Sequence, residues 1–144
     1  NTLNAISETG SVDFVLSYAQ WTLINQEFGK WLTVFREQNI GFINAAPFAM
    51  GLLTRSGPPK WHPAAQEIKN LCQDIARQLQ GSNLDLARVA LQFSLSRKGP
   101  QTTLASARSV AEIEQWGEWL ADPLPQASLA EATKLLEPIL GTLW

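Results

Sequence analysis

GFINAAPFAMGLLTRSGPPKWH, residues Gly41–His62, is the stretch that decides the fold of this chain. It begins with a short β-rich run, Phe42–Ala46, which ends at Pro47-Phe48. It then passes through the small-residue corner Ala49-Met50-Gly51 into a long loop that contains no carboxylate. A buried strand followed by a loop rich in glycine and proline is typical of α/β enzymes, which build the rim of a ligand site at strand carboxyl ends.

Strand-like and helix-like patterns alternate on both sides of this stretch. Val12–Tyr18 is a near-continuous apolar run, which predicts a strand buried on both faces. Apolar residues at three- and four-residue steps predict a helix from about Glu27 to Gln38. After the break at Gly99-Pro100, Thr102–Ala105 predicts a third short strand. This alternation indicates parallel strands joined by right-handed crossovers.

Proline, glycine and short polar residues predict where the helices begin and end. Pro63 opens a helix in its first turn, and Gly81 ends it. Ser82 with Asp85 predicts the N-cap of the next helix. The apolar stripe of the first of these helices comprises Ile68, Leu71, Cys72, Ile75 and Leu79.

Two capping boxes predict helices near the C-terminus. They pair Ser109 with Glu112 and Ser128 with Glu131, and each helix starts directly after its serine. The first of these helices is expected to carry three side chains inward: Ile113, Trp116 and Leu120.

Composition favours a globular protein and excludes several partner classes. Charged residues make up 17% of the 144 residues and the net charge is −2, so no basic field attracts nucleic acid or a membrane surface. The apolar runs are too short to span a bilayer. The polar N-terminal residues lack a signal-peptide pattern, and a cytoplasmic location is expected by default. The one cysteine, Cys72, excludes an internal disulfide and a cysteine-rich metal site, and no metal is expected.

Three strands are too few for a complete fold of this kind. They cannot close into a barrel, and as an open sheet they leave two apolar strand edges unpaired. The chain is therefore expected to be one incomplete α/β unit over residues 1–144, part of a larger barrel.

The corner and its loop resemble the aldo-keto reductase family. In that family, a strand ending in Ser-Pro-Leu is followed by Gly-Leu-Leu-Thr, which corresponds here to Ala46-Pro47-Phe48 and Gly51-Leu52-Leu53-Thr54. The branch of L-galactose, L-fucose and threo-aldose dehydrogenases adds a Gly-Pro-Pro-x-Trp-His-Pro loop, matched by residues 57–63. The resemblance implies strands six to eight of a TIM (β/α)8 barrel with their helices and the C-terminal helix, the N-terminal half being absent.

The resemblance implies an NAD(P)-dependent enzyme that oxidises an aldose by hydride transfer. In the family a tyrosine acts as general acid or base, supported by a lysine that pairs with an aspartate, and a histidine orients the substrate. All four come from the first four strands, so no catalytic residue maps onto this chain. Tyr18 and His62 are the only tyrosine and histidine present, and the isolated chain is expected to be inactive. A non-catalytic half-barrel that binds a nucleotide or a partner chain is the alternative.

The resemblance implies that this chain contains half of a cofactor-binding site. Tyr18, at the end of strand six, occupies the position that contacts the nicotinamide amide, or it is a strand-end aromatic at the barrel mouth. Ala46, Pro47, Phe48 and Gly51 line the pyrophosphate and ribose, although Phe48 is equally a loop anchor.

The adenosine end departs most from the family pattern. Ser106 and Arg108 follow strand eight, and Arg108 either pairs with a phosphate or is a solvated arginine. Trp116 replaces the adenine-facing asparagine and either stacks on adenine or joins the core. Glu112 stands where relatives place arginine or glutamine near the 2′-oxygen, which slightly favours NAD over NADP.

The Gly-Pro-Pro loop offers a sugar contact. Trp61 and His62 are candidates for binding the substrate, because a tryptophan face suits C–H-rich sugar rings. A loop packed over the outer edge of the barrel explains the same residues. The expected partners are a sugar and the missing half of the barrel.

Overall fold

The sheet has three parallel strands in the order β1-β2-β3. In the computed structural model, which describes residues 2–96 and 99–141, these are β1 (Phe14–Tyr18), β2 (Gly41–Ala45) and β3 (Thr102–Leu104). Tyr18 pairs with Ala45, and Ala45 pairs with Leu104, so the three carboxyl ends meet at one edge. The predicted parallel sheet is confirmed, with strand ends shifted by at most two residues.

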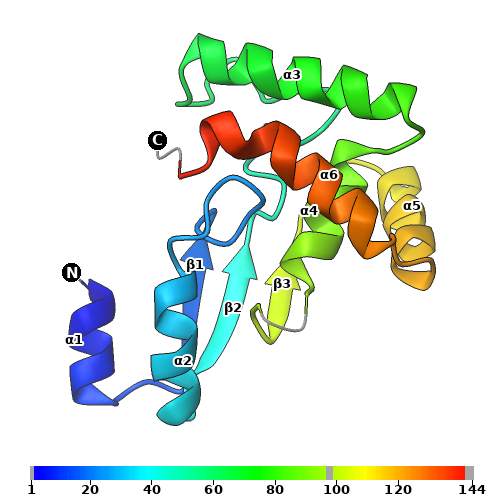
Figure 1. Cartoon of the computed structure of the whole chain (residues 1–144). Helices are drawn as coiled ribbons and strands as arrows, with labels where there is room; N and C mark the ends of the chain where they lie inside the picture. The colour runs from blue at the N-terminus through cyan, green and yellow to red at the C-terminus, as the bar shows by residue number, and fades with distance from the viewer. Residues whose placement is uncertain (1, 97–98, 142–144) are drawn as a thin grey trace.

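Helices cover one face of the sheet and extend beyond the strand ends (Figure 1). Helix α2 packs on β2, while α3, α4 and α6 pack on one another. The helices are α1 (Thr2–Thr9), α2 (Gly29–Glu37), α3 (Gln66–Gly81), α4 (Leu86–Ser94), α5 (Val110–Ala121), α6 (Gln126–Leu136) and the 3-10 turn η1 (Glu137–Ile139).

Two apolar clusters hold these layers together. The strand cluster lies between the sheet and α2 and comprises Val15, Trp21, Phe28, Leu32, Phe35, Ile40 and Phe42. The helix cluster joins the loop after β2 to α3, α4 and α6, with Phe48, Ala49, Leu52, Leu53, Cys72, Leu79, Val89 and Leu136 among its buried members. Phe93 packs against both clusters and stacks on Trp21 at a centroid separation of 5.5 Å.

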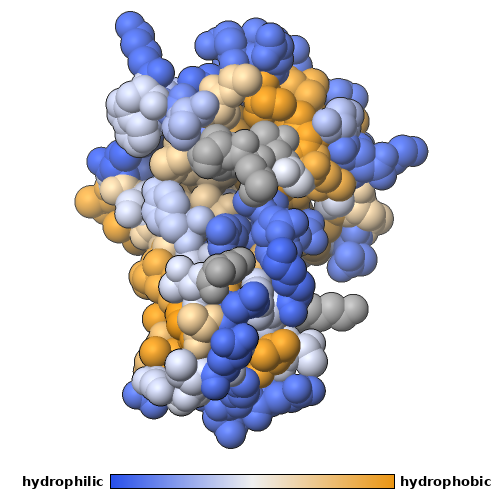
Figure 2. Space-filling model, turned by 90° about the vertical axis from the view of Figure 1, so that its left-hand side faces the viewer, coloured by the Kyte–Doolittle hydropathy of each residue, from blue (hydrophilic) through white to orange (hydrophobic). Residues whose placement is uncertain are grey.

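The expectation that β1 is buried on both faces is wrong. Val15 and Ser17 face the helices and are buried, whereas Phe14, Leu16 and Tyr18 are 69%, 54% and 57% exposed. The helices cover only one side of the sheet, so alternate side chains of this apolar run reach solvent. The register places further residues of β2 and β3 on this open sheet face, among them Ile43, Ala45 and Leu104. Figure 2 shows apolar surface on the lower part of the molecule, where the strands, α1 and α2 lie.

Several predicted helix starts are wrong. Asp85 alone caps α4, accepting from the Ala87 N–H at 2.7 Å, while Ser82 follows the end of α3. Pro63 lies three residues before the first residue of α3, and the chain from Pro63 to Ala65 is still a loop. Gly81 does end α3, as predicted.

The two predicted capping boxes have different outcomes. Ser109 caps α5 as predicted, and its hydroxyl accepts from the Glu112 N–H at 3.2 Å, whereas the Glu112 carboxylate accepts from the Arg108 N–H at 2.6 Å. Ser128 caps nothing, because α6 already begins at Gln126 after Pro125. Pro125 is the N-cap residue of α6, with φ −56° and ψ 144°.

The structure also differs from the sequence predictions at α1 and α5. Helix α1 was not expected from the polar N-terminal sequence, yet its Leu3 and Ile6 pack against the strand cluster. On α5, Trp116 packs inward as predicted, but Ile113 and Leu120 are 59% and 52% exposed. The described chain offers these two side chains no neighbouring layer.

We expect the isolated chain to self-associate, because the open sheet face and the edge of β1 expose apolar side chains and free backbone groups. Size-exclusion chromatography over a range of micromolar concentrations should show oligomers, and Leu16→Thr should shift them toward monomer. Leu95→Thr, which removes an exposed leucine away from the sheet face, should have no such effect. A sharp monomer peak for the unmodified chain, with cooperative thermal unfolding, would show that three strands suffice.

Candidate functional site

The chain leaves β2 through a tightly wound corner, Ala46–Gly51. Four of its six residues have positive φ: 61° at Ala46, 49° at Ala49, 54° at Met50 and 91° at Gly51. The Ala46 N–H still donates to the Leu104 carbonyl oxygen at 3.2 Å, so the turn begins while the chain is bound to β3. Left-handed conformation costs a non-glycine residue roughly 1–3 kcal/mol and concentrates at functional sites.

The side chain of Phe48 points from this corner into the helix cluster. Its ring is 8% exposed and lies against Trp116 of α5, with centroids 5.1 Å apart. The structure thus brings together two of the predicted site residues. Both contribute to packing, and Pro47 sits between the strand end and this anchor.

Arg108 forms an ion pair within the segment after β3 and a hydrogen bond to the loop that follows the corner. The Arg108 guanidinium donates to Glu112 through Nη2 at 3.0 Å and through Nε at 3.2 Å. Its Nη2 also donates to the Ser56 hydroxyl at 3.1 Å. The Arg108 N–H and its side chain hold the pKa of the Glu112 carboxyl below its usual range. The two charged residues predicted for the adenosine end, Arg108 and Glu112, therefore pair with each other.

Tyr18 ends the neighbouring strand β1, and Ser106 lies two residues after the end of the other neighbouring strand, β3. Tyr18 lies on the open sheet face beside Ala45, and its ring is 57% exposed. Ser106 is exposed in the segment between β3 and α5. Adjacent strands lie about 4.8 Å apart, so the predicted strand-end residues share one edge of the sheet.

The Gly-Pro-Pro loop folds back onto the corner. A Cβ on Gly51 would lie 3.2 Å from the Gly57 carbonyl oxygen and 3.4 Å from the Pro58 Cα, so a side chain there would be crowded by the loop backbone. Trp61 is 72% exposed, whereas His62 is 3% exposed. His62 Nε2 lies 3.1 Å from the Ala49 carbonyl oxygen, and its Nδ1 accepts from the Ala64 N–H at 3.1 Å. The two predicted sugar contacts thus point in different directions.

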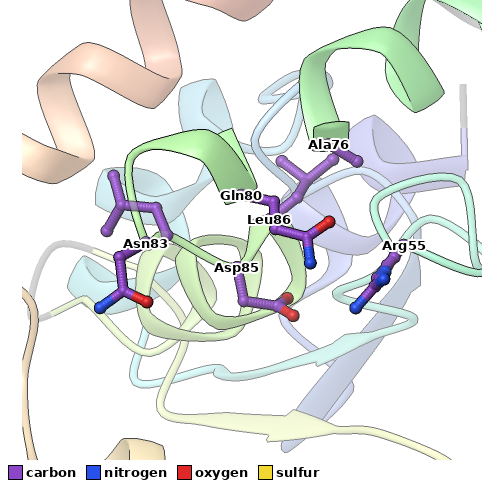
Figure 3. Close-up of a pocket in the computed structure, with 7 residues that line it drawn as sticks. Arg55, Ala76, Gln80, Asn83, Asp85 and Leu86 are labelled. Carbon is purple, nitrogen blue, oxygen red and sulfur yellow. The ribbon is translucent and has the colours of Figure 1, made fainter. Parts of the chain in front are cut away.

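Two hollows lie away from these residues. A cavity of about 170 Å3 separates the end of α3 from the start of α4, and Figure 3 shows Arg55 and Asp85 facing each other across it. A groove of about 720 Å3 runs along α6 and includes Phe93 and Lys134 in its lining. No predicted site residue lines either of them.

Residues 2–96 and 99–141 contain neither a metal site nor a reactive thiol. Over that part of the chain, no group of three or more histidine, cysteine, aspartate or glutamate side chains is placed to hold a metal ion. Burial raises the pKa of the Cys72 thiol to about 12, so it remains a protonated core residue. No helix in the described part is long and apolar enough to cross a membrane.

Comparison with known proteins identifies the family. A sequence profile of the aldo/keto reductase family matches residues 1–137. The chain belongs to the aldo/keto reductase family. It is 31% identical to L-galactose dehydrogenase of Arabidopsis thaliana over 139 residues, which are 94% of this chain and 44% of that relative. It is 32% identical to D-arabinose 1-dehydrogenase of Saccharomyces cerevisiae over 103 residues, 65% of this chain and 30% of that relative.

Solved aldo/keto reductases share the fold. The holo form of an aldo-keto reductase from Bacillus halodurans superposes with a TM-score of 0.69 at 18% identity, covering 99% of this chain and 48% of that one. The apo form gives the same TM-score at 19% identity. The predicted family resemblance is confirmed, and the chain spans less than half the length of the relatives it matches.

We expect Gly51→Ala to destabilise the chain by about 3 kcal/mol, because it adds crowding against the Gly57–Pro58 backbone to left-handed strain. Gly10→Ala is the matched control: its φ is also positive, at 57°, but a Cβ there meets nothing within 4 Å. It should cost only about 1 kcal/mol. Urea denaturation at one protein concentration measures both, and equal losses would refute the tight contact between corner and loop.

Proposed function

We propose that this chain is the C-terminal part of an NAD(P)-dependent aldo/keto reductase that oxidises an aldose. In this proposal β1, β2 and β3 are strands six, seven and eight of a (β/α)8 barrel. The observation that supports this proposal is that the carboxyl ends of three adjacent parallel strands share one edge of the sheet. At that edge lie Tyr18, the corner Ala46–Gly51 and the segment Ser106–Glu112. Active sites of such barrels lie at that edge. The names of the two sequence relatives support an aldose as substrate.

The missing part of the barrel would cover what this chain leaves open. Phe14, Leu16 and Leu104 would point into the barrel interior, which side chains from all strands fill in layers. Val110 and Ile113, 72% and 59% exposed on α5, would pack against a neighbouring helix of the missing half. Both apolar surfaces favour this reading over a self-sufficient domain.

The residues present fit one side of a dinucleotide. The wound corner offers backbone groups and little side-chain bulk to the pyrophosphate and ribose, and Tyr18 stands beside it for the nicotinamide end. Arg108, Glu112 and Ser106 would form the adenosine end, with Trp116 behind them supporting Phe48. When bound, the nicotinamide accepts the hydride from the sugar carbon. The exposed Trp61 offers the sugar an apolar face, and the buried His62 contributes through the position of its loop.

We expect the isolated chain to show no dehydrogenase activity. Proton transfer at the sugar oxygen needs a positioned acid or base, and here Tyr18 is exposed on the open sheet face. Lys30, on the following helix α2, is paired with Glu27 at 2.6 Å. Purified 1–144 should be assayed with NAD and NADP against aldoses including L-galactose and L-fucose. Turnover clearly above a heat-killed control would overturn this expectation.

A reconstructed full-length enzyme should bind NAD at least as well as NADP. The Arg108 guanidinium already pairs with Glu112, and a carboxylate near the adenosine 2′-oxygen repels a 2′-phosphate. Glu112→Gln should free Arg108 and lower the dissociation constant for NADP about tenfold, equivalent to about 1.4 kcal/mol. Glu118→Gln, an exposed change on the same helix, is the control. A dissociation constant tenfold lower for NADP in the unmodified enzyme would show that Arg108 dominates.

A non-catalytic half-barrel that binds a nucleotide or a partner chain is the second candidate, and the open sheet face is the observation that favours it. The two candidates differ in the codons upstream of Asn1. An open reading frame that supplies an aspartate, tyrosine, lysine and histidine series supports the enzyme, whereas a start codon beside Asn1 supports the half-barrel.

A further inference from the structure

His62 makes hydrogen bonds to three segments of the chain. Its Nε2 lies 3.1 Å from the Ala49 carbonyl oxygen of the corner, and its Nδ1 accepts from the Ala64 N–H just before α3. Its own carbonyl oxygen accepts from the Lys69 ammonium of α3 at 2.6 Å. The ring is 3% exposed. This one residue thus links the corner, the Gly-Pro-Pro loop and α3, the first through its ring and the last through its carbonyl oxygen.

We propose that His62 is a positioning residue, which holds the strained corner Ala46–Gly51 in place through its neutral ring and does not itself contact the sugar. That this corner receives the cofactor rests on the proposed function. The positioning itself rests only on the contacts described above.

The hydrogen-bond partners allow only one protonation state of the ring. A carbonyl oxygen can only accept, so Nε2 carries the proton toward Ala49. A backbone N–H can only donate, so Nδ1 is the bare nitrogen toward Ala64. A second proton on the ring would set two donors against each other at Ala64. The neutral Nε2–H tautomer is therefore the form that holds the corner.

The surroundings of the ring also oppose protonation. Burial is the main cause that lowers the pKa of His62 below 6.5, and the positive charge of Lys69 adds to it, against the hydrogen bond to Ala49. The corner carries no titratable side chain, and the charged residues of the loop, Arg55 and Lys60, are cations. Glu67, in the first turn of α3, is exposed.

The corner needs such a clamp because its conformation is unfavourable by itself. Left-handed residues persist only where the surrounding structure determines them. Ala49 and Met50 are two such residues in succession, and the His62 bond is made at the Ala49 carbonyl between them. Loss of this bond should therefore loosen the corner without unfolding the helices.

The tautomer can be observed directly, because His62 is the only histidine of the chain. In 15N NMR of 1–144, in the Leu16→Thr background if the chain self-associates, the ring nitrogens should show the Nε2–H tautomer with a titration midpoint below 6.5. An Nδ1–H tautomer, or a midpoint at or above 6.5, would overturn the proposal.

Protonation of His62 should also lower the stability of the folded chain. A histidine with a lowered pKa in the folded state binds more protons when unfolded, so stability rises with pH between the two pKa values. The stability that neutral His62 provides is complete above 6.5 and is lost as the pH falls below it. Stability to urea should drop from pH 7.5 to pH 5.5, and His62→Gln should remove that drop. An unchanged pH dependence in His62→Gln would contradict the assignment.

Substitutions test whether the ring positions the corner. His62→Gln keeps a donor near the Nε2 position, whereas His62→Asn keeps only the end that faces Ala64. Hydrogen exchange of the Leu52 and Leu53 N–H groups, which bond to Ala49 and Phe48, should speed up about tenfold in His62→Asn and much less in His62→Gln. The Val89 N–H of α4 should be unaffected. Equal exchange in both variants and the unmodified chain would overturn the proposal.

A reconstructed full-length enzyme separates this inference from the proposed function. There His62→Asn should raise the cofactor dissociation constant about fivefold or more, with partial rescue in His62→Gln and little change in the sugar KM. Trp61→Leu should instead raise the sugar KM. A raised sugar KM with unchanged cofactor affinity in His62→Asn would refute positioning of the cradle. Failure of the unmodified enzyme to bind NAD or NADP would refute the proposed function, and the exchange test would still decide the clamp.

Discussion

The central strand β2 is hydrogen-bonded on both sides, and the rest of the molecule is built around it. Besides the two strand ladders, Phe42 donates its N–H to the Gln101 side chain at 2.7 Å, and the Gln101 N–H donates back to Phe42 at 3.2 Å. Asn44, fully buried on the helix-covered face, donates to the Trp21 carbonyl oxygen at 3.0 Å. These side-chain bonds fix the segment before β3 and the segment after β1 against the same strand.

The strain of the corner follows from this double pairing. Ala45 is paired with Tyr18 on one side and Leu104 on the other, and Ala46 still donates to β3. The chain can leave the sheet only by a sharp turn directly after the last paired residue. A left-handed residue supplies such a turn, and the helix cluster compensates for its cost by burying Phe48 and the residues that follow.

Local sequence patterns predicted the strands and their parallel order, but they did not predict which residues each side chain contacts. The parallel order and the Ser109 cap follow from short-range periodicity and from a bond between residues three positions apart. The one-sided burial of β1 does not, because an apolar run gives no information about which layer lies over each face. The Arg108–Ser56 bond joins residues 52 positions apart, and no sequence signal indicates it. The inward orientation of His62 depends equally on the distant Ala49 carbonyl, while its neighbour Trp61 points outward.

The two faces of the sheet differ in how far this chain itself covers them. On the helix-covered face, Val15 and Phe42 are buried by elements that this chain itself supplies. The corner after β2 is likewise held by contacts within the chain, through Phe48 and His62. Tyr18 lies on the open face and has no such cover among the described residues. Under the proposed function, the pyrophosphate side of the cradle is therefore formed by this chain alone, whereas the nicotinamide side takes its final shape only when the remaining strands close over the open face.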